Sequence, residues 1–301
     1  MAVSHATIHP TMPSENDNPS PKTQPPPLAS LAFSSLSALA TRCATHPLDT
    51  IKVIVQTSPS ASITHILQTQ SLASLYRGLG IATVFSVPAL SLYLHTYDQC
   101  STRLARLAGA HDGPALLAVH AVSAASAEAL SSVFWTPMEV LKNTLQAAPA
   151  RARPSTLALA AHIYRREGIR GFFRGYVLSL AVFVPYSVIY YVAYEQLKRG
   201  CAPAELGFAT YAACAGVAGA VAGAASNGLD VVKTRVQVGA GRVRAGDVMR
   251  DIYRREGAMG FARGAGHRVA WITPSVVLSM SIYEVLKDSW KHDQEAGKRH
   301  E

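Results

Sequence analysis

Apolar residues dominate the chain, but polar and charged residues interrupt every long apolar stretch. No stretch is a clean run of ~20 apolar residues, which is the length that an isolated transmembrane helix needs. Arg42, His46, Glu128 and Asp230 all lie inside candidate helices. Ionisable groups at membrane depth normally face a bundle interior or a water-filled cavity. The pattern therefore predicts a helical membrane protein with a channel-like centre.

One sequence unit occurs three times along the chain. Residues 47–52 read Pro-Leu-Asp-Thr-Ile-Lys, residues 137–142 repeat this pattern, and residues 228–233 repeat it with glycine in place of proline. The three lysines lie 90 and 91 residues apart, and a glutamine follows each of them by four positions. A repeat of fixed period marks the unit that folds, and this unit is too long for a solenoid repeat.

A second pattern follows in each unit, where an aromatic–acid pair ends ten residues after a proline. Its copies run from Pro88 to Asp98, from Pro185 to Glu195 and from Pro274 to Glu284. The two patterns predict two helices per unit and six in all. The predicted organisation is a tail, three repeats and a second tail, at residues 1–27, 28–108, 115–203, 206–290 and 291–301. The first tail is rich in Pro, Ser and Thr, carries one basic residue, Lys22, and is expected to be disordered.

A third pattern closes the segment between the two helices of each unit. It reads Leu75-Tyr76-Arg77-Gly78 in the first copy, Phe172-Phe173-Arg174-Gly175 in the second and Phe261-Ala262-Arg263-Gly264 in the third, and an acid–glycine pair precedes the last two copies. With three patterns in three copies, the sequence resembles the mitochondrial carrier family over roughly residues 28 to 290.

This resemblance implies a fold and an activity. The fold would be an all-α membrane protein with six transmembrane helices in three pseudo-symmetric two-helix repeats, short matrix helices and a central cavity. The activity would be solute transport across the mitochondrial inner membrane by alternating access. We expect a monomer in a lipid bilayer, with no cofactor, with cardiolipin at the matrix-side helix ends, and with both termini on the intermembrane-space side.

Composition and charge agree with this interpretation. The chain has 301 residues, of which 49% are apolar and 16% charged, which fits a membrane protein without a separate soluble domain. Of its 28 Lys and Arg residues, 18 fall in residues 52–80, 142–176 and 233–268, as the positive-inside rule expects on one side of a membrane. The net charge of +9 could also indicate nucleic-acid binding, but no compact motif of that kind accompanies it.

The resemblance also implies a matrix gate, in which the acid of one repeat pairs with the base of the next. The expected pairs are Asp49 with Lys142, Glu139 with Lys233, and Asp230 with Lys52, braced by Gln56, Gln146 and Gln237. In each repeat the acid and the base three residues later share one face of the helix. The alternative is that these pairs are fixed contacts between helices and do not open.

An outer gate is expected on the second helix of each repeat, but its first copy is incomplete. Lys198 follows Glu195 and Lys287 follows Glu284, whereas Ser101 occupies the position of the base after Asp98. The family's pairing would join Asp98 to Lys198 and Glu195 to Lys287, and would leave Glu284 without a counter-charge. We therefore expect the matrix-open state to be less favoured.

The third repeat departs from the pattern as well. Gly228 stands where the other repeats have a proline, and glycine permits a bend without enforcing one. We therefore expect the fifth helix to be straighter or more mobile than its partners.

The family's substrate-contact positions are mostly apolar in this chain. They carry Phe85-Ser86, Val182-Phe183 and Trp271-Ile272. Charge is found instead on the first helices of the repeats, as Arg42 and Glu128, which are both placed on the pore-facing stripe. One fixed cation and one fixed anion suit a small zwitterion such as an amino acid or a derivative. The predicted substrate residues are Arg42, Ser86, Glu128, Tyr186 and Trp271.

Alternatives remain at this stage. Arg42 and Glu128 could neutralise each other instead of binding a ligand, because an unpaired charge within a membrane is costly. The chain could also be a scaffold or receptor that keeps the carrier fold without transport. An enzyme is not favoured, since no nucleophile, base and orienting group recur at a recognisable spacing. Cys43, Cys100, Cys201 and Cys214 show no metal-ligand spacing, and neither a disulfide framework nor a metal site is predicted.

Overall fold

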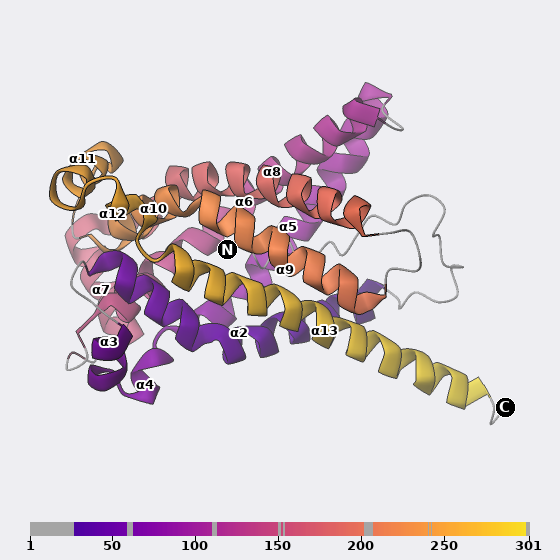
Figure 1. Ribbon diagram of the computed structural model, residues 1–301, viewed down its shortest axis with the longest axis horizontal. Helices are drawn as coiled ribbons and strands as arrows, with labels where there is room; N and C mark the ends of the chain where they lie inside the picture. Colours follow the sequence, from indigo (N-terminus) through magenta and orange to yellow (C-terminus); the bar gives the residue numbers. More distant parts are fainter. Residues whose placement is uncertain are drawn as a thin grey trace. The chain divides into compact units, whose positions relative to one another are not determined.

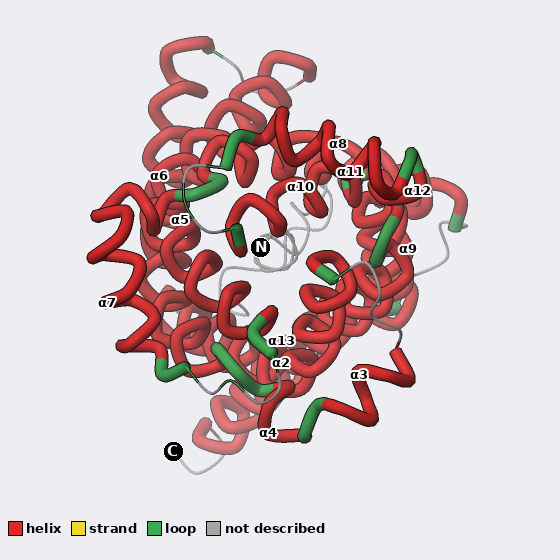
Figure 2. Tube along the Cα trace, turned by 90° about the vertical axis from the view of Figure 1, so that its left-hand side faces the viewer, coloured by secondary structure: helices red, strands yellow, loops and turns green. Residues whose placement is uncertain are grey.

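A computed structural model describes residues 27–58, 63–109, 113–149, 152, 154–201, 207–239, 241 and 243–298. Every regular element in these residues is a helix, and none of them forms a strand (Figure 2). The chain divides into two compact units. The first unit comprises the described parts of residues 1–45, 187–223 and 269–301, and the second unit comprises those of residues 46–186 and 224–268.

Six long helical stretches carry the fold. They are α2 (Pro27–Thr57), α5 (Leu79–Ala108), α6 (Gly113–Ala147), α8 (Tyr176–Gly200), α9 (Phe208–Ala225) with α10 (Asn227–Val238), and α13 (Ala265–Lys298). Four stretches are long and apolar enough to cross a membrane, at residues 72–108, 156–200, 208–225 and 259–290. The all-α membrane fold predicted from the sequence is thereby confirmed.

Shorter helices connect the long ones within the second unit. They are α3 (Ile63–Thr69), α4 (Leu72–Leu75), α7 (Thr156–Glu167), η2 (Gly168–Phe173), α11 (Ala245–Glu256) and α12 (Met259–Ala262). In the third repeat, α11 and α12 pack beside α10 (Figure 1). Val231, Val232 and Ile252 form the buried apolar core of this group. The short helices therefore rest on the same helix that carries the acid and base of their repeat.

Glycines at the ends of the connecting segments allow close contact with the next repeat. Gly78, Gly175 and Gly264 all have positive φ, at 81°, 75° and 74°. A Cβ atom on Gly264 would lie 2.9 Å from Cγ of Gln56, and one on Gly78 would lie 2.9 Å from Cγ of Lys142. Both the backbone conformation and the contact require glycine. The aromatic–base–glycine pattern thus brings each connecting segment against the predicted gate residues.

The fifth helix differs from its counterparts in the other two repeats. Helices α2 and α6 continue without interruption through Pro47 and Pro137. In the third repeat, however, α9 ends at Ala225 and α10 begins at Asn227. The fifth helix is therefore divided where its counterparts are continuous, and the expectation that it is straighter or more mobile stays a prediction. Tertiary hydrogen bonds explain the interruption, because the Asn227 side chain donates to the backbone oxygen of Phe261 at 2.8 Å.

Small residues allow helices to approach closely in the first unit. On α9, Gly216 packs against α13, where a Cβ atom would lie 3.2 Å from Cγ2 of Val277. Gly219 and Gly223 on the same helix are also buried. On the other side of α13, the Ser37 hydroxyl of α2 donates to the backbone oxygen of Ser279 at 2.5 Å. Such faces are typical of packed transmembrane helices.

Candidate functional site

Three buried ion pairs join α2, α6 and α10 in the second unit. Lys142 Nζ lies 2.6 Å from Asp49 Oδ2. Lys233 Nζ lies 2.7 Å from Glu139 Oε2, and Lys52 Nζ lies 2.6 Å from Asp230 Oδ2. All six side chains are at most 12% exposed. Each helix gives its acid to one neighbour and its base to the other, so the pairs close a ring of three helices.

The three glutamines brace these pairs as the sequence led us to expect. Gln56 Nε2 donates to Asp230 Oδ2 at 3.0 Å, and Gln237 Nε2 donates to Glu139 Oε2 at 2.9 Å. Gln146 Nε2 donates to Asp49 Oδ2 at 3.3 Å and to Thr50 Oγ1 at 2.9 Å. Each carboxylate of the ring therefore receives a lysine and an amide. Buried charges are tolerated when they are paired and hydrogen-bonded in this way.

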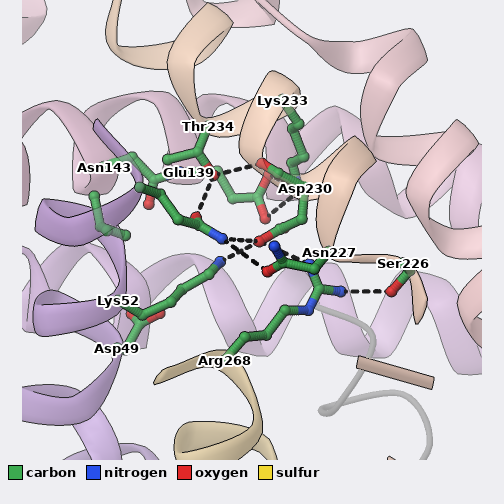
Figure 3. A network of polar contacts seen from close by, with 12 residues as sticks. Asp49, Lys52, Glu139, Asn143, Ser226, Asn227, Asp230, Lys233, Thr234 and Arg268 are labelled. Carbon is green, nitrogen blue, oxygen red and sulfur yellow. Dashed lines mark hydrogen bonds and ion pairs between the residues drawn. The ribbon is translucent and has the colours of Figure 1, made fainter. Parts of the chain in front are cut away.

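The carboxylate of Asp230 has a further cationic partner that sequence reasoning missed. Arg268 Nη1 lies 2.7 Å from Asp230 Oδ2, and Arg268 Nη2 donates to the Ser226 hydroxyl at 3.0 Å. Lys52 and Arg268 both point toward Asp230 (Figure 3). A repeat-by-repeat comparison could have found this residue, because Arg268 follows Gly264 by four positions, where the other repeats have Ala82 and Ser179.

Further polar residues surround the same carboxylate. Thr234 Oγ1 donates to Gln56 Oε1 at 3.1 Å, and Gln56 Nε2 lies 3.4 Å from Asn227 Oδ1. Beside the Glu139 pair, Asn143 Nδ2 donates to Gln237 Oε1 at 2.7 Å. The sequence patterns gave no weight to Thr234, Asn227 or Asn143. Their contacts fix the orientation of two of the bracing glutamines.

A second group of charges lies at the end of α10 and α11. Arg235 binds Glu256 through two nitrogens, at 2.5 and 3.1 Å, and Arg263 Nη1 lies 2.6 Å from Glu256 Oε2. The hydrogen bonds from Arg235 lower the pKa of the Glu256 carboxyl below its ordinary value. Arg235 Nε also donates to the backbone oxygen of Gln56 at 2.8 Å. This group therefore links the third connecting segment to the end of α2.

The arginines of the other two connecting segments make a comparable link. Arg77 Nη1 donates to the backbone oxygens of Ala148 and Pro149 at 3.3 Å each, just beyond the end of α6. Arg174 donates to the backbone oxygen of Gly239, just beyond the end of α10. Each of these bases thus satisfies carbonyl groups at the C-terminus of the next repeat's first helix, where the helix leaves them without intrahelical partners.

The predicted outer-gate residues pair within their own helices. Lys198 Nζ lies 3.5 Å from Glu195 Oε1 on α8, and Lys287 Nζ lies 3.0 Å from Glu284 Oε1 on α13. In this conformation Glu195 and Lys287 have local partners, and the expected pair between them, which belongs to a closed outer gate, stays a prediction. The local partners lie three residues away on the same helix face and need no movement of a helix.

The remaining predicted outer-gate acid is in the second unit. Asp98 lies on α5, where its backbone oxygen accepts a hydrogen bond from the Ser101 hydroxyl at 3.1 Å. Ser101 therefore makes a contact within its helix at the position where the other two repeats carry a base.

The predicted substrate residues are divided between the two units. Arg42 and Trp271 belong to the first unit, and Ser86, Glu128 and Tyr186 belong to the second. Glu128 is 1% exposed and Oε1 lies 3.4 Å from the Ser132 hydroxyl, while Tyr186 is 1% exposed. Ser86 donates to the backbone oxygen of Ala82 on its own helix at 2.5 Å, and Arg42 and Trp271 are half-buried. A common site for these five residues stays a prediction.

The three-fold sequence pattern that builds the ring of pairs is found in a known family of proteins. The model of the family described as mitochondrial carrier protein matches residues 23–107, 114–203 and 204–294. The chain belongs to the mitochondrial carrier family. Members of this family are transporters of the mitochondrial inner membrane that cross it several times. Among the described residues of this carrier, no group of three His, Cys, Asp or Glu side chains is arranged to hold a metal ion.

Relatives of this carrier have different names. It is 32% identical to an uncharacterized mitochondrial carrier of Schizosaccharomyces pombe, over 85% of this chain and 96% of that protein. It is 27% identical to mitoferrin of Dictyostelium discoideum, over 85% of this chain and 92% of that protein. It is 31% identical to a mitochondrial adenyl nucleotide antiporter of Homo sapiens, over 82% of this chain and 56% of that protein.

Proposed function

We propose that this carrier moves a small zwitterionic metabolite across the inner membrane by alternating access, with the ring of three ion pairs as its matrix gate. The observation that carries the proposal is that the acids and bases of the ring pair between helices, whereas Lys198 and Lys287 pair within theirs. Alternating access requires that one end is closed while the other is open. A matrix-closed state needs contacts between helices at the matrix end and none between the gate helices at the outer end. The contacts of the ring and of Lys198 and Lys287 fit this requirement.

The energetics of the ring suit a gate that must open. Removing one member of a buried pair costs about 3–5 kcal/mol, because the other charge is left uncompensated. All three pairs must separate when the gate opens. The open state is populated only if new contacts elsewhere offset this cost in free energy. The gains available at the outer end are the pairs of Asp98 with Lys198 and of Glu195 with Lys287. Glu284 would gain no partner there, because Ser101 is uncharged.

The incomplete outer gate provides a test of this balance. Ser101→Lys would supply Glu284 with a base, and an exposed pair of this kind contributes at most about 1 kcal/mol. We expect the variant to favour the matrix-open state modestly, seen as greater labelling of cysteines engineered on the matrix side and slower labelling at the outer mouth. Unchanged labelling at both ends would contradict the outer-gate assignment.

The substrate class follows from the charges within the helices rather than from the relatives. Mitoferrin and an adenyl nucleotide antiporter handle unlike solutes, so their names do not fix the solute of this carrier. Glu128 is a buried acid on α6, which the carrier fold would place in the membrane, and acids within membrane-spanning helices mark substrate or ion pathways by default. We propose that Arg42 meets the carboxylate of the solute and Glu128 its ammonium group, with Ser86, Tyr186 and Trp271 around them.

A ligand screen tests this assignment. Purified carrier is screened by thermal shift against amino acids and their derivatives, since a ligand of the folded state raises apparent stability. Arg42→Ala and Glu128→Ala should each remove the shift and leave the unliganded protein folded. Ser126→Ala is the matched control, because its hydroxyl bonds only to its own helix, at Val122. If the double alanine variant regains stability that both single variants lose and keeps the ligand shift, the two residues are a structural pair.

The same proposal includes orientation, lipid and oligomeric state. We propose that both termini face the intermembrane space, that a monomer is the working form, and that cardiolipin binds at the matrix-side helix ends. The basic residues of the connecting segments support this orientation. A scaffold or receptor without transport is the second candidate, which the uncharged Ser101 favours. If reconstituted protein binds a solute of the screen but transports none of the screened solutes, the scaffold or receptor is favoured.

A further inference from the structure

Two cysteines of the first unit lie side by side, one directly after α8 and the other on α9. Cys201 directly follows Gly200, the last residue of α8, and Cys214 lies in the second turn of α9. Their sulfur atoms are 3.9 Å apart. Cys201 is partly exposed and Cys214 is 5% exposed. Both are free thiols.

We propose that Cys201 and Cys214 form a reversible disulfide that ties α8 to α9. A disulfide has an S–S distance of about 2.0 Å, and Cys residues can be bridged without backbone movement only if their side chains already face each other. These two sulfurs do so. Among the described residues, Cys43 and Cys100 have no sulfur partner, and they serve as internal controls. The sequence spacing gave no signal for this pair, because neither cysteine belongs to a CxxC pattern.

The partly exposed thiol is the one that reacts first. Lys198 lies three residues before Cys201, near the end of α8, and the partial exposure of Cys201 gives an oxidant access to its sulfur. The Cys201 thiolate attacks one oxygen of hydrogen peroxide and becomes a sulfenic acid, and hydroxide leaves. Cys214 then gives its proton to that hydroxide, which becomes the first water. The resulting Cys214 thiolate attacks the sulfenic sulfur and expels a second hydroxide. This hydroxide takes up the proton first lost by Cys201 and becomes the second water. The sum is two thiols and one peroxide to one disulfide and two waters.

The consequence for transport rests on the proposed function. Lys198 is the base of the second repeat's outer gate, and it shares the end of α8 with Cys201. Its Nζ lies 5.5 Å from the ring centre of Tyr194 on α8 and 6.0 Å from that of Tyr211 on α9. Closing the outer gate requires Lys198 to leave Glu195 and reach Asp98. A disulfide from α8 to α9 restrains that movement, so the oxidised carrier should transport more slowly.

Peptide mapping tests the disulfide without any knowledge of the solute. No Lys or Arg lies between Cys201 and Cys214, so trypsin leaves both on one peptide, whereas cleavage after Glu205 separates them. Full-length carrier in liposomes is oxidised with hydrogen peroxide, alkylated and cleaved at glutamate without reductant. We expect the two cysteine peptides to remain joined in the natural chain and in the Cys43→Ser/Cys100→Ser variant. Cys201→Ser and Cys214→Ala should abolish the joined product. A Cys214 that stays open to alkylation after oxidation would overturn the proposal.

Transport measurements test the consequence separately. Uptake by the oxidised natural chain should fall severalfold and recover with a thiol reductant, while Cys214→Ala should be unaffected by peroxide. A disulfide that forms without any change of uptake would overturn the regulatory part alone. If no solute is transported in either redox state, the proposed function fails, whereas the mapped disulfide still establishes the site.

Discussion

The first and third repeats differ at the position of the repeated proline in their first helices. Helix α2 runs without interruption through Pro47, whereas the helix of the third repeat, which has Gly228 instead, is divided at Ser226. In the first repeat, His46 Nε2 lies 2.9 Å from the backbone oxygen of Arg77. In the third repeat, Asn227 at the equivalent position reaches the oxygens of both Phe261 and Arg263.

The acids of the two repeats differ as well. Asp49 is held by Lys142 and Gln146, whereas Asp230 is held by Lys52, Gln56 and the additional Arg268. The comparison shows that the helix with proline is continuous and that the helix without it is divided. In the third repeat, which lacks the proline ring, side-chain contacts with the connecting segment and with α13 hold Asp230 in place.

The largest expected effect comes from reversing a charge in the less supported pair. Lys142→Glu places two acids together in the buried ring, so we expect transport to be lost. Adding Asp49→Lys restores opposite charges and should recover part of the activity. Uptake of the identified solute by reconstituted carrier measures both. Full activity in the single variant would show that this pair is not part of a gate.

Neutralising the paired lysine should destabilise the protein more at Asp49 than at Asp230. Lys142→Met leaves Asp49 without its paired lysine, and we expect it to lower the free energy of unfolding by about 3–5 kcal/mol. Lys52→Met leaves Arg268 on Asp230, so its cost should be clearly smaller. Thermal unfolding of the two variants in the same detergent measures the difference. Equal losses would mean that Arg268 does not support Asp230.

The role of Arg268 can be measured against the matching position of another repeat. Arg268→Ala removes one of two cations from Asp230 and a donor from Ser226, and should cost about 1.5–3 kcal/mol, as expected for hydrogen bonds to charged groups. Ser179→Ala is the matched control at the equivalent position, where the hydroxyl bonds only to the backbone oxygen of Gly175. Comparable unfolding temperatures for the two variants would rule out the special role of Arg268.

The smallest effect concerns the missing proline itself. Gly228 is the second residue of α10, and a Cβ atom there would lie 3.5 Å from Cβ of Phe261, an ordinary contact. Proline is tolerated in the first turn of a helix. Gly228→Pro should therefore stabilise the fold by about 0.4–1 kcal/mol, because proline lowers the conformational entropy of the unfolded chain. A loss of stability would indicate that the divided helix needs the freedom of glycine.

The sequence predicted the fold and the nine residues of the ring because both depend on a pattern repeated three times. It missed Arg268 because that residue has no counterpart in the repeats, and a comparison at Ala82 and Ser179 is needed to notice it. It missed the divided helix because the decisive contacts of Asn227 lie 34 residues away, at Phe261. The pair of Glu195 with Lys287 stays a prediction, because it belongs to a closed outer gate and both residues have local partners in this conformation.

The closed ring has a consequence for the order in which the fold can be completed. Asp49 and Lys142 are 93 residues apart, and Glu139 and Lys233 are 94 apart, but Gln56 and Asp230 are separated by 174 residues. The last link therefore joins the beginning of the polypeptide to its final third, so the ring closes only when all three repeats are in place. Each doubling of a loop adds only about 0.6 kcal/mol to its closure, so this long separation adds little to the free energy of closing the ring. A chain truncated before the third repeat would leave one acid and one base of the ring without their partners, and we expect it to be unstable.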